Sequence, residues 1–476
     1  MNSSTKVSLQ NISFISTNSR DETGKVFTYN GKIFRAIYKH KTAFVKELLG
    51  CGLIEELNQK GMFPKTTISD IELEGFELVL EHEVIYPVVL PPQWTFDMLK
   101  DAGEFAIVLN QIALKYGYQT MDCHGYNILF KNNDPVYIDF GSFIKVPSGF
   151  KGWFAYENFL QSFYYPLKIA EAGNWYFARL VMLQPDPIPH YSFYYFKSSL
   201  YKLFKQKTID LFLSTFYKFK LIRYFSEEEI KEKTPVSLKK LTIFLNKLGI
   251  LPFQSTNLNA LAKKVKNISI KNIQTEWGAY HNDLQDANGL IKSTLRFDQI
   301  LSVLKGLEVN SVLELGGNQG VFSRIISERT NIETIICTDY DETAVNLMYN
   351  LLKKTKHRVT PALLNFVTPN ENYYGARVYE RFKSDAVFAL ALSHHLILTQ
   401  KMSVKSLFEE VIKYSNRYVF IEFMPMGLYS DRSKRKIVTP EWYNVDWFRG
   451  NFGDCFTILH EEQLEKNRIL FVGEIK

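Results

Sequence analysis

This sequence of 476 residues has few cysteines, a small net charge and no long apolar runs. The four cysteines, Cys51, Cys123, Cys337 and Cys455, lack the close spacing of a zinc site or a disulfide framework, so we expect reduced thiols in the core. No apolar run is long enough to cross a bilayer, and the first residues lack the apolar core of a signal peptide. The expected location is therefore the cytoplasm, with contact at the inner membrane as a further option. A net charge of +7 is small for this length and does not require an anionic partner.

The Gly-x-Gly-x-x-Gly loop of nicotinamide-dependent enzymes and of protein kinases is absent as well. A different glycine-rich turn lies at 316–320, between an apolar run at 311–315 and an amphipathic segment. This order predicts strand, turn and helix, in which glycine lets a cofactor approach the backbone and the helix directs its free N–H groups at it. A second β-rich run, 334–338, ends at Asp339, where a βαβ unit presents a carboxylate to ribose hydroxyls.

The order of Glu314, Gly316, Gly320 and Asp339 resembles the first two motifs of class I S-adenosylmethionine-dependent methyltransferases. A nicotinamide-binding unit is the main alternative, and it is disfavoured because the acidic residue Glu314 lies inside the first strand. A tight strand-to-helix turn with no ligand is a third interpretation. The resemblance implies that the cofactor S-adenosylmethionine contacts Glu314, Gly316, Gly317, Asn318, Gly320, Asp339, Tyr340, Asn365, Phe366 and Leu392.

Further apolar runs at 359–364, 385–392 and 418–423 predict a parallel sheet, closed by an antiparallel hairpin over 455–461 and 468–474. Ser393-His394-His395 and Glu422 then fall at the carboxyl edge of the sheet, where open α/β folds bind ligands. His394 or His395 is the candidate base for an acceptor hydroxyl, and Glu422 could assist it or bind substrate. Simple packing or helix capping is the alternative for either histidine.

A second candidate site lies in the N-terminal half. Asp122, Asn127 and the Asp139-Phe140-Gly141 triplet have the spacing of the base and the two metal ligands of protein kinases, so Asn127 and Asp139 are candidate Mg²⁺ ligands beside bound ATP. Thr120 stands where kinases usually carry histidine, and no Val-Ala-x-Lys strand is evident. An inactive kinase-like scaffold and a purely structural hairpin are the alternatives.

The missing kinase lysine leaves Lys32 or Arg35 as the candidate cation, with Glu47 as its partner on a helix over 42–60. The pattern also predicts strands at 31–38, 72–80 and 84–90, and a long helix from Thr95 to Tyr116 that Gly117 ends.

The predicted fold class is α/β, with a Rossmann-like methyltransferase domain preceded by an α+β kinase-like domain and a helical bridge. The predicted parts are a flexible lead-in over 1–28, the kinase-like domain over 29–175, the bridge over 176–285 and the methyltransferase domain over 286–476. The bridge interleaves aromatic residues with lysines, which suits a helical core with basic outer faces and would also suit a membrane surface.

The sequence further resembles the nodulation-protein NoeA-like methyltransferases over nearly its whole length. The resemblance is carried by 92–102, Asp122 with Tyr126-Asn127, 135–143, 275–277, the glycine turn, 389–396 and 421–423. It implies a methyltransferase that modifies surface saccharides or signal molecules. Members usually carry Asp-Leu-Gly-Ala-Asn-Thr-Gly in the turn, so Glu314 and Gly317 depart from the pattern, and Asn365 stands where aspartate is more usual.

Three functions follow from these motifs. The first is O-methylation of a saccharide or related small acceptor by S-adenosylmethionine. The second is a bifunctional enzyme whose N-terminal half uses ATP and magnesium to phosphorylate a glycan end that the C-terminal half methylates. The third is a non-catalytic ligand-binding protein in polysaccharide assembly. Nucleic acid is disfavoured as a substrate because no basic stripe adjoins the methyltransferase motifs.

Overall fold

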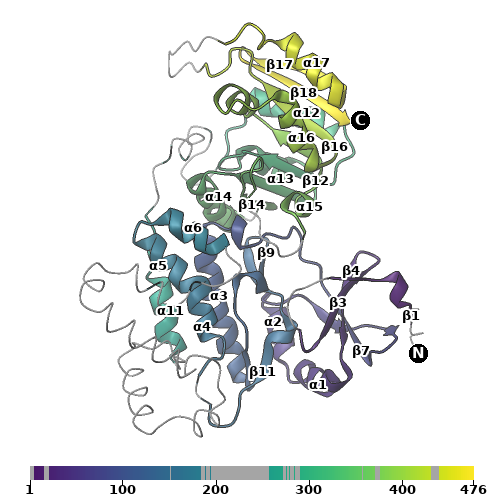
Figure 1. Cartoon of the computed structure of the whole chain (residues 1–476), viewed down its shortest axis with the longest axis vertical. Helices are drawn as coiled ribbons and strands as arrows, with labels where there is room; N and C mark the ends of the chain where they lie inside the picture. Colours follow the sequence, from purple (N-terminus) through teal and green to yellow (C-terminus); the bar gives the residue numbers. More distant parts are fainter. Residues whose placement is uncertain are drawn as a thin grey trace, which may run out of the picture.

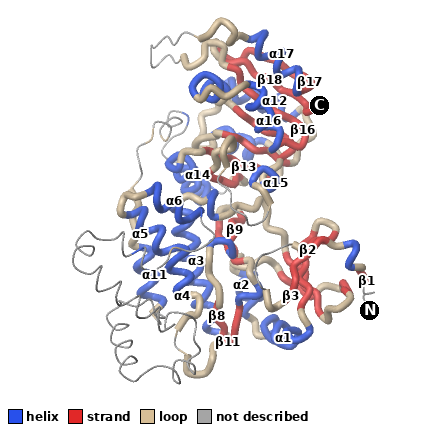
Figure 2. Tube along the Cα trace, in the orientation of Figure 1, coloured by secondary structure: helices blue, strands red, loops and turns tan. Residues whose placement is uncertain are grey.

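The chain forms an elongated molecule with three parts in the computed structural model (Figure 1). The structure describes residues 5–15, 21–150, 152–183, 188, 193, 257–271, 275, 278, 284, 290–355, 357–369, 376–429 and 439–476. A small sheet built by the N-terminal residues and a group of helices lie side by side at one end, and a larger α/β domain lies at the other (Figures 1 and 2).

The small sheet is antiparallel and has the strand order β2-β3-β4-β7-β5. Its strands are β2 (Ser13–Phe14), β3 (Gly24–Tyr29), β4 (Lys32–Ile37), β5 (Thr66–Ile68) and β7 (Leu78–His82). A separate parallel pair joins β1 (Thr5–Val7) to β6 (Ile71–Leu73). The prediction of a flexible lead-in over 1–28 was therefore wrong for its described residues, because β2 and β3 belong to this sheet.

Two further predictions for the N-terminal part need correction. The helix expected over 42–60 is divided into α1 (Thr42–Gly50) and α2 (Leu53–Gln59), because Gly52 takes a left-handed φ of 90° between them. The strand expected over 84–90 is an irregular segment that contains the cis peptide bond Tyr86–Pro87.

The helical part is centred on α3 (Phe96–Lys115), which begins and ends where the sequence predicts. The Thr95 hydroxyl caps it by accepting a hydrogen bond from the N–H of Met98 (3.3 Å). Around α3 lie α4 (Tyr156–Phe159), α5 (Tyr165–Glu171), α6 (Trp175–Leu183) and α11 (Leu258–Lys266), with the hairpins β9 (Ile128–Lys131) to β10 (Asp134–Tyr137) and β8 (Tyr118–Thr120) to β11 (Phe143–Lys145). The Lys100 ammonium donates to Ile268 O (2.7 Å), so the described end of the predicted bridge packs on this part. Most of the aromatic and lysine-rich segment lies outside the described residues.

The C-terminal domain contains a seven-stranded sheet with the order β14-β13-β12-β15-β16-β18-β17. The first five strands in this order are parallel and the last two pairings are antiparallel, which confirms the predicted parallel sheet and closing hairpin. The strands are β12 (Ser311–Leu315), β13 (Thr334–Asp339), β14 (Val359–Leu363), β15 (Ser384–Ala389), β16 (Ser415–Phe423), β17 (Phe456–Glu465) and β18 (Arg468–Ile475). The helices are α12 (Leu295–Lys305), α13 (Val321–Arg329), α14 (Glu342–Thr355), α15 (Val378–Arg381), α16 (Val404–Lys413) and α17 (Val445–Cys455).

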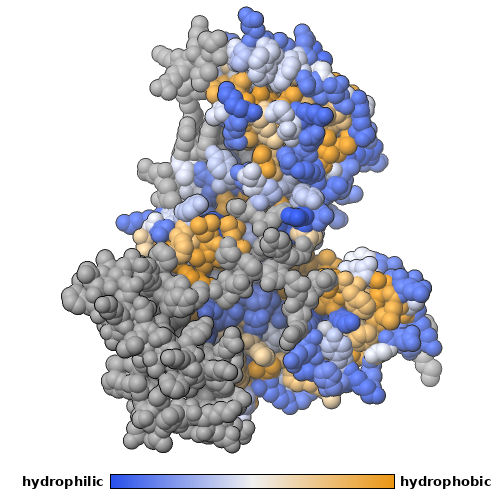
Figure 3. All heavy atoms as spheres, in the orientation of Figure 1, coloured by the Kyte–Doolittle hydropathy of each residue, from blue (hydrophilic) through white to orange (hydrophobic). Residues whose placement is uncertain are grey.

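Apolar surface is not gathered on one large face in the view of Figure 3. It lies on the small sheet and beside α6, whereas the outer rim of the C-terminal domain is mostly hydrophilic. Among the described residues, no helix combines the length and apolar character needed to cross a bilayer.

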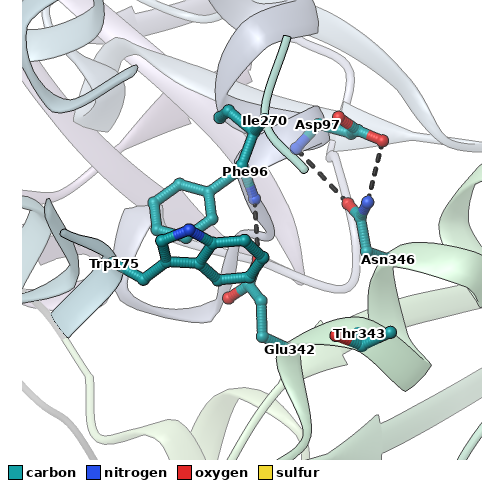
Figure 4. Close-up of a pocket in the computed structure, with 7 residues that line it drawn as sticks. All are labelled: Phe96, Asp97, Trp175, Ile270, Glu342, Thr343 and Asn346. Carbon is teal, nitrogen blue, oxygen red and sulfur yellow. Dashed lines mark hydrogen bonds between the residues drawn. The ribbon is translucent and has the colours of Figure 1, made fainter. Parts of the chain in front are cut away.

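Helix α14 joins the C-terminal domain to the helical part (Figure 4). Two of its side chains accept hydrogen bonds from the first turn of α3: Glu342 Oε1 from the N–H of Phe96 (2.8 Å) and Asn346 Oδ1 from the N–H of Asp97 (3.3 Å). The Asn346 amide also donates to Asp97 Oδ2 (2.8 Å). A small cleft lies here, lined by Phe96, Asp97, Trp175, Ile270, Glu342, Thr343 and Asn346.

The rest of α14 continues this contact. The Tyr349 hydroxyl donates to Asp101 Oδ2 (2.6 Å), and the Asn133 amide at the tip of the β9–β10 hairpin donates to Val359 O (3.2 Å). The hairpin that separates Asn127 from Asp139 is thus tied at its tip to β14.

Candidate active site

The glycine turn joins β12 to α13 at the carboxyl edge of the sheet. Gly316 and Gly320 have φ values of +66° and +69°, the left-handed region that favours glycine. A Cβ on Gly316 would lie 2.6 Å from Leu392 Cδ2, and one on Gly320 would lie 2.5 Å from Met348 Sδ. The turn is therefore packed tightly against the ends of neighbouring elements, and only glycine fits at these two positions.

Glu314 is buried directly beneath this turn. Its Oε2 accepts hydrogen bonds from the N–H (3.1 Å) and the hydroxyl (2.5 Å) of Ser323 in the first turn of α13. Burial raises the pKa of the Glu314 carboxyl to about 7, although the bonds from Ser323 act in the opposite direction. Glu314 thereby fixes the start of the helix that carries the turn, which is a positioning role rather than an exposed ligand contact.

Asp339 ends β13 next to the glycine turn, as the sequence predicts. Its Oδ2 accepts a hydrogen bond from the N–H of Asn318 (2.9 Å), and its Oδ1 accepts one from the N–H of Asp341 (2.9 Å). Burial raises its pKa to about 6. The backbone N–H of Tyr340 also lowers this pKa by hydrogen bonding, so backbone groups take up most of the acceptor sites of the carboxylate.

The residues that follow the neighbouring strands differ in exposure. Tyr340, directly after Asp339, is 61% exposed and presents a large aromatic side chain at this edge. Phe366 is buried and packs edge-on against Tyr414, so it belongs mainly to the core. Asn365 is exposed, and its Oδ1 accepts hydrogen bonds from the N–H groups of Val367 and Thr368 (3.2 Å each). An adenine contact through that oxygen would have to compete with this turn, and the role of Asn365 stays a prediction.

Two contributors to the site were missed in the sequence. Asp341 is the buried cap of α14, where its Oδ1 accepts from the N–H groups of Thr343 (2.8 Å) and Ala344 (3.1 Å). Its place just before an amphipathic run was the available signal. The side-chain amide of Gln319 donates to Gly278 O (2.7 Å), which lies about 40 positions earlier in the chain. No local sequence pattern could have revealed that contact.

The two candidate histidines lie side by side after β15, with ring centroids 4.1 Å apart. His394 is buried, and its Nδ1 has no hydrogen-bond partner within the described residues. Burial, with help from His395 and Arg468, lowers the pKa of His394 to about 3, so its ring is neutral but weakly basic at neutral pH. His395 is only half-buried and is therefore the more accessible of the two.

The structure accounts for Glu422 without a catalytic role. Its side chain is fully buried, and its carboxylate forms a bidentate pair with Arg296 (2.6 and 2.8 Å) and a further bond with Arg468 (3.0 Å). Although burial opposes ionisation, the two guanidinium groups lower the pKa of Glu422 below its usual value. An ionised and fully paired carboxylate does not act as a base, so the predicted assisting role is corrected to a structural one.

In the N-terminal site, Asp122, Asn127 and Asp139 come together at the base of the β9–β10 hairpin. The Asn127 amide group points its nitrogen at Asp139 Oδ2 (3.5 Å), and His124 Nε2 lies 3.1 Å from Asp122 Oδ2. Asp139 Oδ1 accepts the N–H of Gly141 (3.0 Å). Burial raises the pKa of Asp139, which Arg35 partly offsets. Thr120, at the position usual for histidine, accepts a buried hydrogen bond from the Trp153 indole (2.8 Å).

The predicted cation pairing in this site was partly wrong. Arg35 is the buried cation near Asp139, but its partner is Asp21, from the segment between β2 and β3. Glu47 instead pairs with Lys145 (2.6 Å) and Lys32 with Glu81 (2.7 Å), both at exposed positions.

The assignment of Asn127 and Asp139 as magnesium ligands stays a prediction. The Asn127 amide lies 3.5 Å from Asp139 Oδ2, and the Arg35 charge partly offsets the raised pKa of Asp139. The described residues contain no group of three or more His, Cys, Asp or Glu side chains arranged to hold a metal ion.

No protein-family model matches the chain. A curated relative, nodulation protein NoeA of Rhizobium meliloti (strain 1021), is 24% identical over an alignment of 426 residues that covers 85% of this chain and 84% of the relative. Among solved structures, N-methyltransferase NodS from Bradyrhizobium japonicum WM9 is 13% identical with a TM-score of 0.28, and covers 38% of this chain and 94% of its own. The bifunctional kinase-methyltransferase WbdD is 17% identical with a TM-score of 0.26, and covers 38% of this chain and 37% of its own.

Proposed function

We propose that this homologue of nodulation protein NoeA is an S-adenosylmethionine-dependent methyltransferase whose acceptor is a saccharide or a related small molecule. The observation that carries the proposal is Asp339, a buried carboxylate at the end of β13 that is held by two backbone N–H groups beside a glycine turn. The order of the seven strands, with one antiparallel strand inserted near the edge, agrees with the class I methyltransferase plan.

The residues at this edge suit the cofactor. A ribose diol needs an acceptor, and Asp339 is the carboxylate placed at this edge to supply one. An adenine ring needs an aromatic or apolar face, which Tyr340 supplies at an exposed position. When bound, S-adenosylmethionine supplies an activated electrophilic methyl group, so the protein has to align the acceptor and to remove a proton from it.

His395 is the better candidate for the proton-accepting group. It lies on the same carboxyl edge as Asp339 but is more accessible than His394, whose burial makes it a weak base. His394 then supports the ring of its neighbour at 4.1 Å. An acceptor hydroxyl would lose its proton to His395 as the new oxygen–carbon bond forms.

Calorimetric titration with S-adenosylmethionine tests the proposal directly. We expect the wild type to bind the cofactor and Asp339→Ala to lose at least a hundredfold in affinity, because charged hydrogen bonds contribute about 1.5–3 kcal/mol each. Asp139→Ala is the control, since it removes a half-buried carboxylate from the other site. Loss of binding in both variants, or in neither, would contradict the proposal.

Kinase activity of the N-terminal half is the second candidate function. In the small sheet the strands lie side by side in the order β2-β3-β4-β7-β5, so only the last two, β5 and β7, exchange their places relative to the sequence. Helices α1 and α2 come between β4 and β5, as in the smaller lobe of protein kinases. Arg35 on the third strand lies near Asp139, in place of the usual lysine. Titration with magnesium and ATP tests this candidate: binding that Asp139→Ala removes would favour the bifunctional enzyme, and absence of binding would leave this half as a scaffold.

A further inference from the structure

An aromatic cluster lies at the start of α17, close to the carboxyl edge that carries His395. Trp442 is 48% exposed, an unusual position for so large a side chain. It meets Trp447 edge-on, with ring centroids 4.9 Å apart. Tyr443 is buried below and lies 5.7 Å from Trp447 and 4.9 Å from Phe423. We call Trp442, Tyr443 and Trp447 the tryptophan platform.

Hydrogen bonds and ring contacts hold the residues of the platform in place. Asn444 caps α17 by accepting the N–H of Trp447 (2.9 Å) and donates to Glu441 O (3.0 Å), which fixes the backbone on both sides of the aromatic residues. Phe448, the next residue of the helix, is fully buried and stacks on Phe423 at 4.6 Å. Because the supporting rings are already packed, a ligand would not have to order them on binding.

Two chains of contacts link the platform to the proposed acceptor site. Phe423, which contacts Tyr443, ends β16 next to Glu422, and Glu422 O accepts a bond from the Ser393 hydroxyl (2.6 Å), one residue before His394. On the other side, Gly427 is in close contact with both Thr439 and Leu398, and Leu398 lies on the helical turn that begins at His395. The platform is thus a few side chains away from the histidine pair along one edge.

The polar groups around the platform indicate its ligand. Glu441, Asn444 and Asp446 are all exposed and flank the two tryptophans. Asp446 is paired with Arg449, and the Asn444 amide is used in the cap of α17. The Glu441 carboxylate and the Asp446–Arg449 pair therefore supply acceptors and donors of both signs, which suits the hydroxyl groups of a neutral sugar.

We propose that the tryptophan platform binds a sugar ring of the acceptor at one or more units from the hydroxyl that is methylated. This inference rests on the proposed methyltransferase function and extends it, because it makes the acceptor an oligosaccharide rather than a small monomer. The exposed Trp442 supplies the flat apolar face against which sugar C–H groups pack, and the carboxylate rim orients the hydroxyls.

Binding of the full-length protein to a printed panel of neutral bacterial oligosaccharides tests the platform. We expect the wild type to retain at least one oligosaccharide, Trp442→Ala to lose tenfold or more in affinity for it, and Trp442→Phe to keep most of the binding. Tyr176→Ala is the control, since Tyr176 is a 78% exposed aromatic residue on α6 in another part of the molecule. Because Trp442 lies at the surface, its replacement should leave the folded state intact, which thermal unfolding checks.

Three outcomes would overturn the inference: no oligosaccharide retained by the wild type, equal retention by Trp442→Ala, or retention only by vesicles of phosphatidylcholine and phosphatidylglycerol. Titration of the same preparations with S-adenosylmethionine separates this failure from failure of the proposed function. Cofactor binding without saccharide binding would leave the methyltransferase proposal standing and remove the platform. Saccharide binding without cofactor binding would contradict the methyltransferase proposal and leave the platform as a saccharide-binding site only.

Discussion

Asp339 and Asp139 each follow a strand, and desolvation raises the pKa of both carboxyls, but they differ in exposure and in what faces them. Asp339 is buried, and the backbone N–H groups of Asn318 and Asp341 donate to it. Asp139 is only half-buried and lies in the field of Arg35, which is itself paired with Asp21. Two similar motifs in the sequence thus have different electrostatic surroundings, because backbone N–H groups compensate one carboxylate and a buried guanidinium compensates the other.

The strongest test of this contrast is to remove the internal cation. We expect Arg35→Met to lower the free energy of unfolding by about 3–5 kcal/mol, because Asp21 and Asp139 would be left without their buried partner charge. Urea denaturation measures this change. Lys32→Met is the control on the same strand, and its exposed pair with Glu81 should contribute less than about 1 kcal/mol. A small effect of Arg35→Met would mean that Asp139 does not depend on internal compensation.

A smaller effect on stability is expected of Asp339. The variant Asp339→Asn keeps the shape of the side chain, but its amide nitrogen replaces one of the two oxygens that accept backbone N–H groups. We expect the free energy of unfolding to fall by about 1–3 kcal/mol in urea denaturation, together with a loss of about tenfold to a hundredfold in affinity for S-adenosylmethionine by calorimetry. A large loss of stability would show that Asp339 is primarily structural and would weaken the contrast with Asp139.

The C-terminal half could be predicted from sequence because its information is local. The strand at 311–315, the glycine turn and Asp339 lie in one βαβ unit, and continuous apolar runs marked β15 and β16. The predicted role of Glu422 was wrong because its partners Arg296 and Arg468 lie 126 and 46 positions away in the sequence. No local pattern shows that they converge on it.

The N-terminal half was harder because tertiary contacts decide its structure. Asp21 lies in a polar segment that was predicted to be a lead-in, yet it forms the ion pair with Arg35. Glu47, the predicted partner of that cation, pairs with Lys145 at the surface. The helix expected over 42–60 had the correct apolar spacing on both sides of Gly52, and only the left-handed backbone there divides it.

A pH titration sharpens the picture of Asp339. Ribose hydroxyls donate to the ionised carboxylate, so affinity for S-adenosylmethionine should fall by about tenfold for each pH unit below about 6, the pKa of Asp339 in the free protein. Calorimetry from pH 5 to pH 8 measures this, and Asp339→Asn should give a flatter profile. A profile that is equally steep in the variant would assign the titration to another group.

Stability should move in the opposite direction over the same range. The folded-state pKa values of Asp339 and Glu314, about 6 and about 7, lie above their ordinary values. Between about pH 4 and pH 7 the folded state therefore holds more protons at these groups than the unfolded state does, and their contribution to stability falls as pH rises. Thermal unfolding of Glu314→Gln should show a shallower decline than the wild type.

The smallest expected effect concerns helix α14, which links the two regions. Helix α14 begins at Glu342, shortly after Asp339 and directly after Asp341. One turn into the helix, Asn346 exchanges hydrogen bonds with Asp97 at the start of α3. Asn346→Ala removes both bonds and should lower stability by about 1–2 kcal/mol, because the N–H of Asp97 loses its cap. Asn350→Ala is the matched control, because it removes a bond to the same Asp97 carboxylate and a bond to Asn346 O but leaves the N–H of Asp97 capped.

Asn346 is not a predicted ligand of the cofactor. If α3 helps to hold the proposed cofactor edge in place, Asn346→Ala should still lower the affinity for S-adenosylmethionine by a few-fold under conditions where the protein remains fully folded. Calorimetry on both variants separates this positioning effect from simple destabilisation. Equal cofactor affinity in the wild type and in Asn346→Ala would mean that the N-terminal half does not influence the cofactor edge through this contact.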